Sequence, residues 1–517
     1  MKTWKYSFFI AIIAFMGVGC ADFLDINTNP NVPQEAPAHT LLPPMFQNIA
    51  RGIQFDSRYI GKYTQNFVDA TSGVVWDGHG YAPGSDAGGE VWRQHYWAVG
   101  RNVDLLINDA RARNLPFYIG VGYAIRAWGW QSIADCNGDA ILKQAWESNR
   151  NNFDFDSQED IYKESIRLAD SALIYLDQKG NVDPNFATAD QFFGGDLAKW
   201  KRFTYGIKAR TLHRLTNKAS YNADAVIAAC DLSMTGNADN ASVPFLGSTT
   251  DDSNFFGTLR SNYTAFRVSK FIVSLLDGTN PAMLGAQDPR LRFMLPQSTA
   301  TDTVVRGGDP AVGASTILNA WGFTTNPSAS NVRGRYLFVD AARFPIMTYS
   351  EIQFIKAEAA FRKGDKATAL TAFRNAVGGH VDFANTYVGV SGSNTTIAMT
   401  ALQKTALLTD TRLVPAVADS LTMSRIMLQK YVALWGWGYI ETWNDLRRFH
   451  YLDAYNGQPV YTAFKFPVAF TSANNGKPVY RLRPRYNSEY VWNRDALDKI
   501  GGNAIDYHTV EMWNTKP

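Results

Sequence analysis

The chain of 517 residues is poor in the residues that build covalent or metal-bound scaffolds. It has three cysteines and seven histidines, and the histidines lie scattered along the chain. Cys20 lies near the N-terminus, which leaves Cys136 and Cys230 for the rest of the chain. Two cysteines in so long a chain build no disulfide framework and are too few for a cysteine-ligated zinc or iron–sulfur site. We therefore predict no metal and no cofactor, while the sequence leaves open whether the two cysteines pair.

An excess of charge of one sign is also absent. The chain has 50 Lys and Arg residues against 47 Asp and Glu residues. Its densest basic cluster is Arg481, Arg483 and Arg485, beside a proline. Because no basic stripe or long basic run is present, we expect no nucleic-acid partner. After the first 19 residues, no hydrophobic run reaches the about 20 residues that a membrane-spanning helix needs.

Motifs of common enzyme classes are missing as well. The chain contains no H-E-x-x-H, no G-x-S-x-G and no P-loop. We therefore expect no enzymatic activity. A surface hydrolase stays open as an alternative, because glycoside hydrolysis needs only two carboxylates roughly 5–10 Å apart. Among 47 acidic residues some pair meets that distance by chance.

The N-terminus has the pattern of a secretory signal. Lys2 and Lys5 precede an apolar run at residues 8–18, which is too short to span a membrane. The run ends at a small residue directly before Cys20, which resembles the lipobox of a bacterial lipoprotein. We expect residues 1–19 to be a cleaved signal peptide and Cys20 to carry the lipid anchor. A plain cleaved signal is the alternative, since glycine stands where a lipobox usually has leucine, three positions before the cysteine.

Apolar residues recur at helical spacing over much of the mature chain, and so we predict a mainly α fold. The pattern predicts helices at 40–69, 91–113, 118–134, 158–178, 199–216, 222–232, 349–377, 400–409 and 418–440. They group into four helix pairs, at 118–178, 199–232, 349–377 and 400–440. Between the second and third pairs, residues 236–345 lose the helical period and are rich in Gly, Ser, Thr, Asn and Asp. We expect this block to be a loop-rich insertion in a single unit, residues 20–517.

The pair within residues 345–377 is typical of a tetratricopeptide hairpin. We expect Ser350 to cap the first helix, with Gln353 completing a capping box. Gly364 is expected to end that helix and Asp365 to begin the next as its N-cap. Small residues on both helices allow a close approach. An ordinary helical hairpin is the alternative, because the spacing alone does not distinguish the two.

Several stretches, in order along the chain, resemble the SusD/RagB family of nutrient-binding outer-membrane lipoproteins. They are Cys20 with residues 22–25; Trp92, Tyr96 and Asn102; residues 200–214; residues 288–291; residues 347–351 with 357–359; residues 441–448; and Arg485, Tyr486, Glu489 and Asn493. Residues 135–140 depart from the family pattern, because they lack the proline that often follows the Gly-Asp turn there.

The resemblance implies a SusD-like α-helical fold with four tetratricopeptide-like helix pairs and an irregular, loop-rich, ligand-binding lobe. It implies an oligosaccharide or, in some members, a peptide as ligand. It also implies a SusC-like TonB-dependent transporter as partner and attachment to the cell outer membrane through lipid, exposed at the surface. We therefore expect a lipoprotein that binds a nutrient and delivers it to the transporter. The alternative is a protein-docking adaptor that binds no glycan.

Candidate ligand contacts lie in three Gly- and Asn-rich loops. A flat Trp or Tyr ring can stack on the apolar face of a sugar, while Asn and Asp reach its hydroxyls. The candidates are Trp76, Asp77 and Tyr81 in the first loop, Asn254 and Tyr263 in the second, and Asn319 and Trp321 in the third. We hypothesise that two or three of these aromatic residues converge into a shallow platform. The alternative is that each ring anchors its own loop on the core.

Aromatic and basic residues inside the helices are interpreted differently. The tryptophans expected to lie in the core or at helix contacts are Trp92, Trp128, Trp130, Trp435, Trp437 and Trp443. Arg447 and Arg448 follow Asp445 closely, and we expect them to join a buried ion-pair network rather than to contact ligand.

Overall fold

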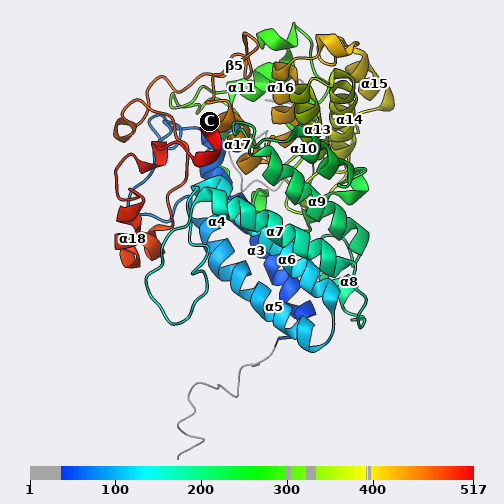
Figure 1. The fold of residues 1–517 in the computed structure, drawn as a ribbon. Helices are drawn as coiled ribbons and strands as arrows, with labels where there is room; N and C mark the ends of the chain where they lie inside the picture. Colours follow the sequence, from blue (N-terminus) through cyan, green and yellow to red (C-terminus); the bar gives the residue numbers. More distant parts are fainter. Residues whose placement is uncertain (1–35, 297–303, 322–333, 392, 394–397) are drawn as a thin grey trace, which may run out of the picture.

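The computed structural model describes residues 36–296, 304–321, 334–391, 393 and 398–517. The predicted signal peptide and Cys20 lie outside these residues. The described chain is mainly helical, which confirms the predicted fold class (Figure 1). Among the described residues, no helix is long and apolar enough to cross a membrane.

The longer helices are α3 (Ala38–Tyr63), α5 (Gly100–Ala112), α6 (Pro116–Asn137), α7 (Gln158–Leu176), α9 (Leu197–His213), α10 (Ala223–Asp231), α11 (Lys270–Asp277), α13 (Tyr349–Lys363), α14 (Lys366–Asn385), α15 (Ala401–Thr409), α16 (Met423–Leu434) and α17 (Tyr439–Arg448). Shorter ones are α4 (Glu90–Arg93), α8 (Phe186–Ala189), α12 (Leu291–Met294) and α18 (Arg494–Lys499). Two π-helical turns, η1 (Gln94–Val99) and η7 (Tyr486–Tyr490), also occur.

The described strands form three small antiparallel sheets of two strands each. They pair β1 (Phe67–Asp69) with β3 (Phe266–Val268), β2 (Ala241–Val243) with β4 (Phe344–Met347), and β5 (Ala454–Tyr455) with β6 (Gln458–Pro459). The described residues of the predicted insertion at 236–345 include β2, β3, α11, α12 and the start of β4. These elements are short, as the fading helical period in that block indicates.

The helices pack as a succession of antiparallel pairs. The pairs α6–α7, α9–α10 and α13–α14 each contact the next, since α7 packs against α9 and α10 packs against α13. Figure 1 shows these helices side by side along one half of the molecule, with the C-terminal residues, coloured red, on the opposite side. The fourth predicted pair is less regular: α15 lies against α14, while α16 packs against α13 and α17.

The hairpin at 345–377 shows one correction to the predicted caps. Thr348, not Ser350, caps α13, because its hydroxyl accepts a hydrogen bond from the backbone N–H of Glu351. Ser350 lies inside the first turn and donates to the carbonyl of Ala376 on α14, at 2.8 Å. Gly364 ends α13 with φ of 90°, and the Asp365 side chain caps α14, as predicted.

Two predicted helices end earlier than their apolar pattern does. The helix expected at 40–69 stops at Tyr63, and the residues after it form β1 instead. The helix expected at 418–440 is α16, which ends at Leu434 before α17 begins. Gly436, with φ of 86°, provides the turn between α16 and α17, a conformation that favours glycine.

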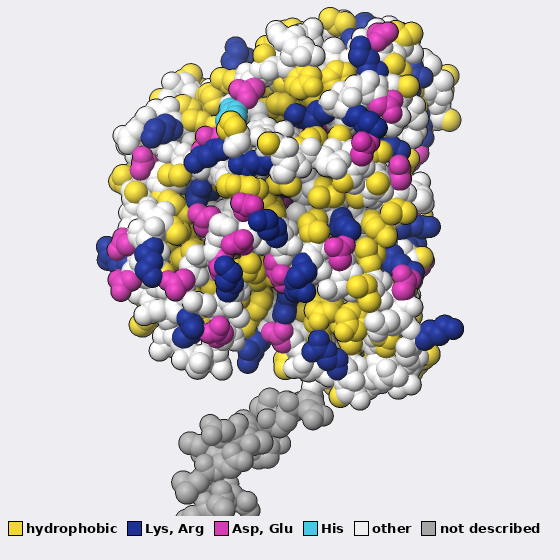
Figure 2. Space-filling model, viewed as in Figure 1, with side chains coloured by type: hydrophobic (Ala, Val, Ile, Leu, Met, Phe, Trp, Pro, Cys, Tyr) yellow, Lys and Arg dark blue, Asp and Glu magenta, His cyan; other side chains and the backbone are white. Residues whose placement is uncertain are grey.

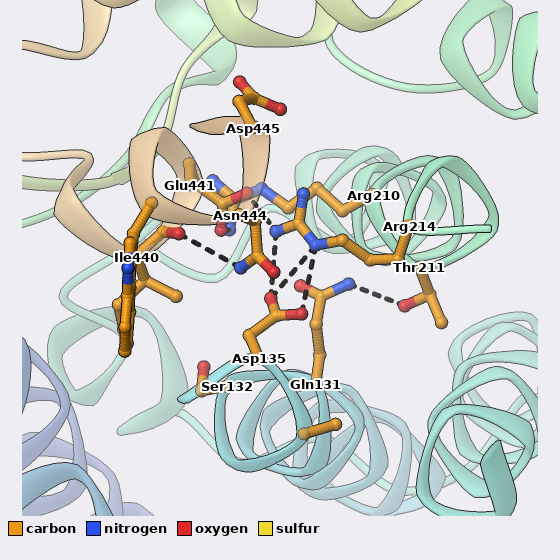
Figure 3. Close-up of polar contacts among 12 residues, drawn as sticks. Gln131, Ser132, Asp135, Arg210, Thr211, Arg214, Ile440, Glu441, Asn444 and Asp445 are labelled. Carbon is orange, nitrogen blue, oxygen red and sulfur yellow. Dashed lines mark hydrogen bonds and ion pairs between the residues drawn. The ribbon is translucent and has the colours of Figure 1, made fainter. Parts of the chain in front are cut away.

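Buried ion pairs join several helices to one another (Figure 3). Arg214, the C-cap residue of α9, donates to Asp135 of α6, at 2.9 Å, and also to Glu441 of α17. Arg210, one turn before Arg214, donates to Glu351 of α13, at 2.6 Å. Against the desolvation that burial imposes, Arg210 and Arg214 hold the pKa of Glu441 at about 2. The four helices are therefore joined by charged groups as well as by apolar contacts.

The network continues along α17. Arg448 pairs with Glu358 of α13, at 2.9 Å, and with Asp445, at 2.6 Å. This confirms the expected ion-pair role of Arg448. Arg447 differs, because its guanidinium donates to the backbone carbonyls of Asp135 and Tyr480, both at 2.6 Å. Many of the residues that carry the family resemblance thus meet inside the helical scaffold.

Candidate functional site

The seven candidate ligand residues predicted from the loops are all buried in the structure. Their exposed fractions range from 0% for Asn254, Tyr263 and Trp321 to 7% for Tyr81 and Asn319. Asn254 donates to the carbonyls of Leu337 and Val339, at 2.8 and 3.1 Å. These side chains therefore do not form a solvent-exposed platform in this structure, and their contact with ligand stays a prediction.

The contacts of the other predicted residues are likewise internal. The Trp321 indole donates to the carbonyl of Phe256, at 2.7 Å, and Asp77 accepts from the backbone N–H of Asp69, at 2.8 Å. The ring of Trp76 lies 4.4 Å from that of Tyr59, between centroids. These contacts match the alternative interpretation, in which each side chain anchors its loop on the core. Tyr81 differs, because it also lines a pocket described below.

A larger pocket, which we call the aromatic pocket, opens beside α4 and η1. Its volume is about 550 Å³, within the range of small-molecule sites. It is lined by Trp92, Arg93, Tyr96, Trp97, Ile141, Ala145, Trp146, Phe153, Arg485, Ser488 and Glu489. Five of these side chains are aromatic, and Trp97 has 66% of its surface exposed. The pocket therefore presents flat apolar faces that solvent reaches.

The π-helical turn η1 places the aromatic residues of one wall. Its residues Gln94 and His95 are buried against α3 and α6, at positions where those helices have glycine. A Cβ added at Gly52 would lie 2.5 Å from the Gln94 side chain, and one at Gly129 would lie 2.5 Å from the His95 ring. Burial lowers the pKa of His95 to about 3, so that its ring stays neutral. With these two residues turned inward, Tyr96 and Trp97 line the pocket.

Trp146 forms the adjoining wall in a strained conformation. Its φ is 64°, a left-handed value that is unusual for a bulky side chain. Its indole N–H donates to the carbonyl of Tyr96, at 2.7 Å, and the guanidinium of Arg126 lies 4.6 Å from its ring centroid. A Cβ at Gly100 would come within 2.2 Å of the indole, so glycine is needed there for the ring to approach. Strained residues of this kind cluster at functional sites.

The opposite wall is formed by the C-terminal segment, which here means residues 481–517 and contributes Arg485, Ser488 and Glu489 to the lining. Asn493 joins this segment to the loop before α7, since its side chain accepts from the N–H and donates to the carbonyl of Phe153, at 3.0 and 2.8 Å. It also donates to Glu489, at 2.8 Å. Burial raises the pKa of Glu489. Arg485 is paired with Asp86, and so its charge is balanced within the wall.

A second pocket, which we call the tyrosine pocket, lies next to the aromatic pocket. It has a volume of about 320 Å³ and is lined by Tyr81, Pro83, Gly84, Arg483, Pro484, Tyr486, Tyr490, Arg494, Asn503 and Ile505. The rings of Tyr486 and Tyr490 stack, with centroids 5.8 Å apart and planes at 16°. The two pockets adjoin because residues 483–490 contribute side chains to both.

The chemistry that the aromatic pocket offers is binding. Its rings can stack on the apolar face of a ligand, while Arg93, Ser488 and Glu489 can exchange hydrogen bonds with polar groups at the rim. Glu489 is the one carboxylate in its lining, whereas glycoside hydrolysis uses a pair. Within the described part of the chain, no group of three or more metal-ligating side chains is present. Cys136 and Cys230 are both buried, unpaired thiols.

Charges of both signs are intermixed on the face of the molecule that Figure 2 shows. No broad area of that face is basic or acidic alone. This distribution agrees with the nearly equal numbers of basic and acidic residues in the sequence.

The aromatic pocket could not be predicted from the sequence, because its walls come from three separate segments. Trp92 was expected in the core or at a helix contact, and it is buried, while Tyr96 is partly buried. One signal was available: Trp97 follows Tyr96 directly, off the apolar stripe of residues 92, 96, 99, 103 and 106. Nothing in the local sequence places Trp146 and Phe153 beside it.

Solved structures with the same fold span nearly the whole chain. A SusD/RagB family protein from Bacteroides thetaiotaomicron VPI-5482 has a TM-score of 0.70 at 22% identity, covering 93% of this chain and 99% of its own. A SusD homologue from Bacteroides fragilis NCTC 9343 has a TM-score of 0.68 at 18% identity, covering 93% and 100%. A chitin-binding SusD homologue from Flavobacterium johnsoniae has a TM-score of 0.65 at 18% identity, covering 92% and 98%.

These identities are low enough that the structural likeness supports the fold alone. No curated protein sequence matches the chain. The sequence does match the model of the SusD-like family, described as "Starch-binding associating with outer membrane", over residues 30–466. Since this match spans most of the chain and the fold agrees with it, the protein belongs to the SusD-like family.

Proposed function

We propose that the protein binds an oligosaccharide in the aromatic pocket and delivers it to a SusC-like TonB-dependent transporter, without catalysis. The observation that carries this proposal is the pocket itself, with its exposed tryptophan and its polar rim. Lipid on Cys20 would hold the protein at the outer membrane, exposed at the cell surface.

The pocket suits a sugar because it combines two kinds of contact. The faces of Trp97 and Trp146 offer flat apolar area to the C–H face of a pyranose ring. Arg93 and Glu489 supply a donor and an acceptor for its hydroxyls. Trp146 is held in place before any ligand arrives, by its hydrogen bond to Tyr96 and its contact with Gly100. A preorganised wall loses little conformational entropy on binding.

Replacing Trp97 tests the proposal directly. Polysaccharides retained by the wild-type protein in affinity electrophoresis would be cut to oligosaccharides and titrated by calorimetry. We expect Trp97→Ala to lower affinity about tenfold, a loss of about 1.4 kcal/mol, because an exposed stacking face is removed. Leu402→Ala is the control, since Leu402 is 78% exposed on α15, away from α4 in Figure 1. Unchanged affinity in Trp97→Ala, or retention of no polysaccharide by the wild type, would contradict the proposal.

Delivery to a transporter is tested separately. Gentle extraction of outer membranes should co-purify the protein with a large β-barrel partner. Co-purification with no glycan retention would favour the adaptor role, and absence of any barrel partner would remove the delivery step. If calorimetry shows that the protein binds peptides and not glycans, the proposed ligand class is wrong. The aromatic pocket would then be tested as the peptide site by the same Trp97→Ala variant.

A further inference from the structure

We propose that the tyrosine pocket binds a hexuronic acid residue of the ligand, with the sugar carboxylate held by Arg483 and Arg494. This inference rests on the proposed glycan-binding function and adds to it the class of sugar. It is carried by an imbalance of charge in the pocket, by its paired tyrosine rings and by its position beside the aromatic pocket.

The two arginines of the pocket lack acidic partners. Among the described residues, neither Arg483 nor Arg494 forms an ion pair with a carboxylate. The guanidinium of Arg483 donates to the backbone carbonyls of Ile505, Ala504 and Gly502, at 2.5, 2.7 and 3.3 Å. It also lies 3.3 Å from the hydroxyl of Tyr490 and 3.4 Å from the Nδ1 atom of His508. These neutral acceptors orient the group without cancelling its charge. Since no acidic residue lines the pocket, its net charge is positive.

The two arginines of the neighbouring aromatic pocket, in contrast, each have an acidic partner. Arg93 and Arg485, which line the aromatic pocket, are paired with Glu90 and Asp86 respectively. Asp86 is occupied further, because it accepts from the backbone and side-chain N–H groups of Asn487, at 2.9 and 2.7 Å. The Asp86 carboxylate, next to the tyrosine pocket, is therefore bound by Arg485 and Asn487 and is paired with neither arginine of that pocket. Unpaired positive charge remains in the tyrosine pocket, where an anionic ligand group would meet it.

The apolar part of the pocket fits a ring. Tyr486 and Tyr490 stack at 5.8 Å, and the guanidinium of Arg483 lies 5.5 Å from the ring centroid of Tyr81. Pro83 and Pro484 add rigid apolar surface. A volume of about 320 Å³ is at the small end of ligand pockets and suits a single sugar residue. Arginine forks bind carboxylates in bidentate geometry, which Arg494 can offer, while Arg483, whose terminal nitrogens donate to the protein, adds its positive charge. A sugar acid therefore satisfies both the charged and the apolar lining.

The two pockets could hold neighbouring residues of one chain. Pro484 and Tyr486 line the tyrosine pocket, while Arg485 between them lines the aromatic pocket. An oligosaccharide whose neutral or acidic residue stacks on Trp97 can therefore extend past Arg485 and place a carboxylate near Arg483. We infer that the preferred ligand is an acidic polysaccharide fragment.

Calorimetry with uronate trisaccharides and their methyl esters tests the inference. The probes are trimers of galacturonate, glucuronate and mannuronate, each measured at low salt as the free acid and as the uncharged ester. We expect at least one acid to bind about tenfold more tightly than its ester. Arg494→Gln should reduce this difference severalfold, because one of the two cations that hold the carboxylate is lost, whereas Arg412→Gln, at an exposed ion pair elsewhere, should preserve it in full. Unchanged thermal unfolding of Arg494→Gln would show that the fold is intact.

The outcomes separate this inference from the proposed function. If neutral oligosaccharides bind with dependence on Trp97 but no acid exceeds its ester, the acidic-sugar inference fails and the proposed function stands. If the acid preference survives undiminished in Arg494→Gln, the assignment to the tyrosine pocket fails. If a tripeptide with a free C-terminal carboxylate binds more tightly than its amide while no uronate does, the pocket recognises a peptide carboxylate and the sugar assignment is overturned.

Discussion

Arg214 is fully buried between Asp135 and Glu441, and its positive charge offsets the negative charges of both carboxylates. Arg214→Met would leave Asp135 without its ion-pair partner and Glu441 with Arg210 alone, in a site that water does not reach. We expect a loss of about 3–5 kcal/mol in the free energy of unfolding. When one partner of a buried ion pair is removed, the other charge stays buried without a compensating charge. Denaturation in guanidinium chloride, followed by circular dichroism, measures this loss.

The matched control is Arg412→Met. Arg412 pairs with Asp410 at 2.7 Å, but its side chain is 51% exposed, so water replaces the lost contact. The unfolding midpoint of this variant should stay close to that of the wild type. An equal shift in the two variants would mean that the buried network does not stabilise the fold as described.

For some residues the local sequence predicted the role correctly, and for others it left two roles open. The short spacing of Asp445 and Arg448 predicted an ion pair, and that pair is present. The aromatic residues of the loops could not be assigned in the same way, since stacking on a ligand and anchoring on the core use the same side chains. Burial of Trp76 and Trp321 was decided by contacts with residues distant in sequence, such as Phe256 for Trp321.

At the level of elements, the run α4, η1 and α5 links the helical scaffold to the aromatic pocket. Gly100 begins α5, and its missing side chain leaves room for the indole of Trp146 and for the carbonyl of His95. Gly100→Ala would place a Cβ within 2.2 Å of the indole and 2.3 Å of that carbonyl. We expect a loss of about 1–3 kcal/mol in stability, as in other overpacked sites.

The same variant should alter the pocket. Displacement of Trp146 would shift the tryptophan fluorescence and weaken oligosaccharide binding. Gly236→Ala is the control, because a Cβ there meets no atom within 4 Å and the backbone is extended, with φ of −176°. Full oligosaccharide affinity in Gly100→Ala would contradict the role given to Trp146.

Helical periodicity located most elements but not their interruptions. The stripe through residues 91–113 predicted a single helix, whereas the π-helical turn η1 lies inside it. The reason is tertiary: Gln94 and His95 enter spaces left by Gly52 and Gly129, which a local pattern does not reveal. Fold class and helix pairs depend on local apolar spacing, and so they could be predicted.

At the scale of the whole molecule, the helix pairs and the pockets occupy different parts of the structure. The pairs from α6 to α14 form one half, while both pockets involve the C-terminal segment on the other side (Figure 1). Ordered motifs along the sequence predicted the family, because many of them serve the buried network. The site could not be predicted in the same way, since it arises where residues 92–97, 141–153 and 485–489 meet.

The central claim is that a sugar binds in the aromatic pocket. The most direct measurement is a crystal structure of the protein with the oligosaccharide that binds most tightly in calorimetry. We expect a sugar ring against the faces of Trp97 and Trp146, with hydroxyls near Arg93 or Glu489. A bound oligosaccharide that lies elsewhere, with no sugar residue in the aromatic pocket, would contradict it.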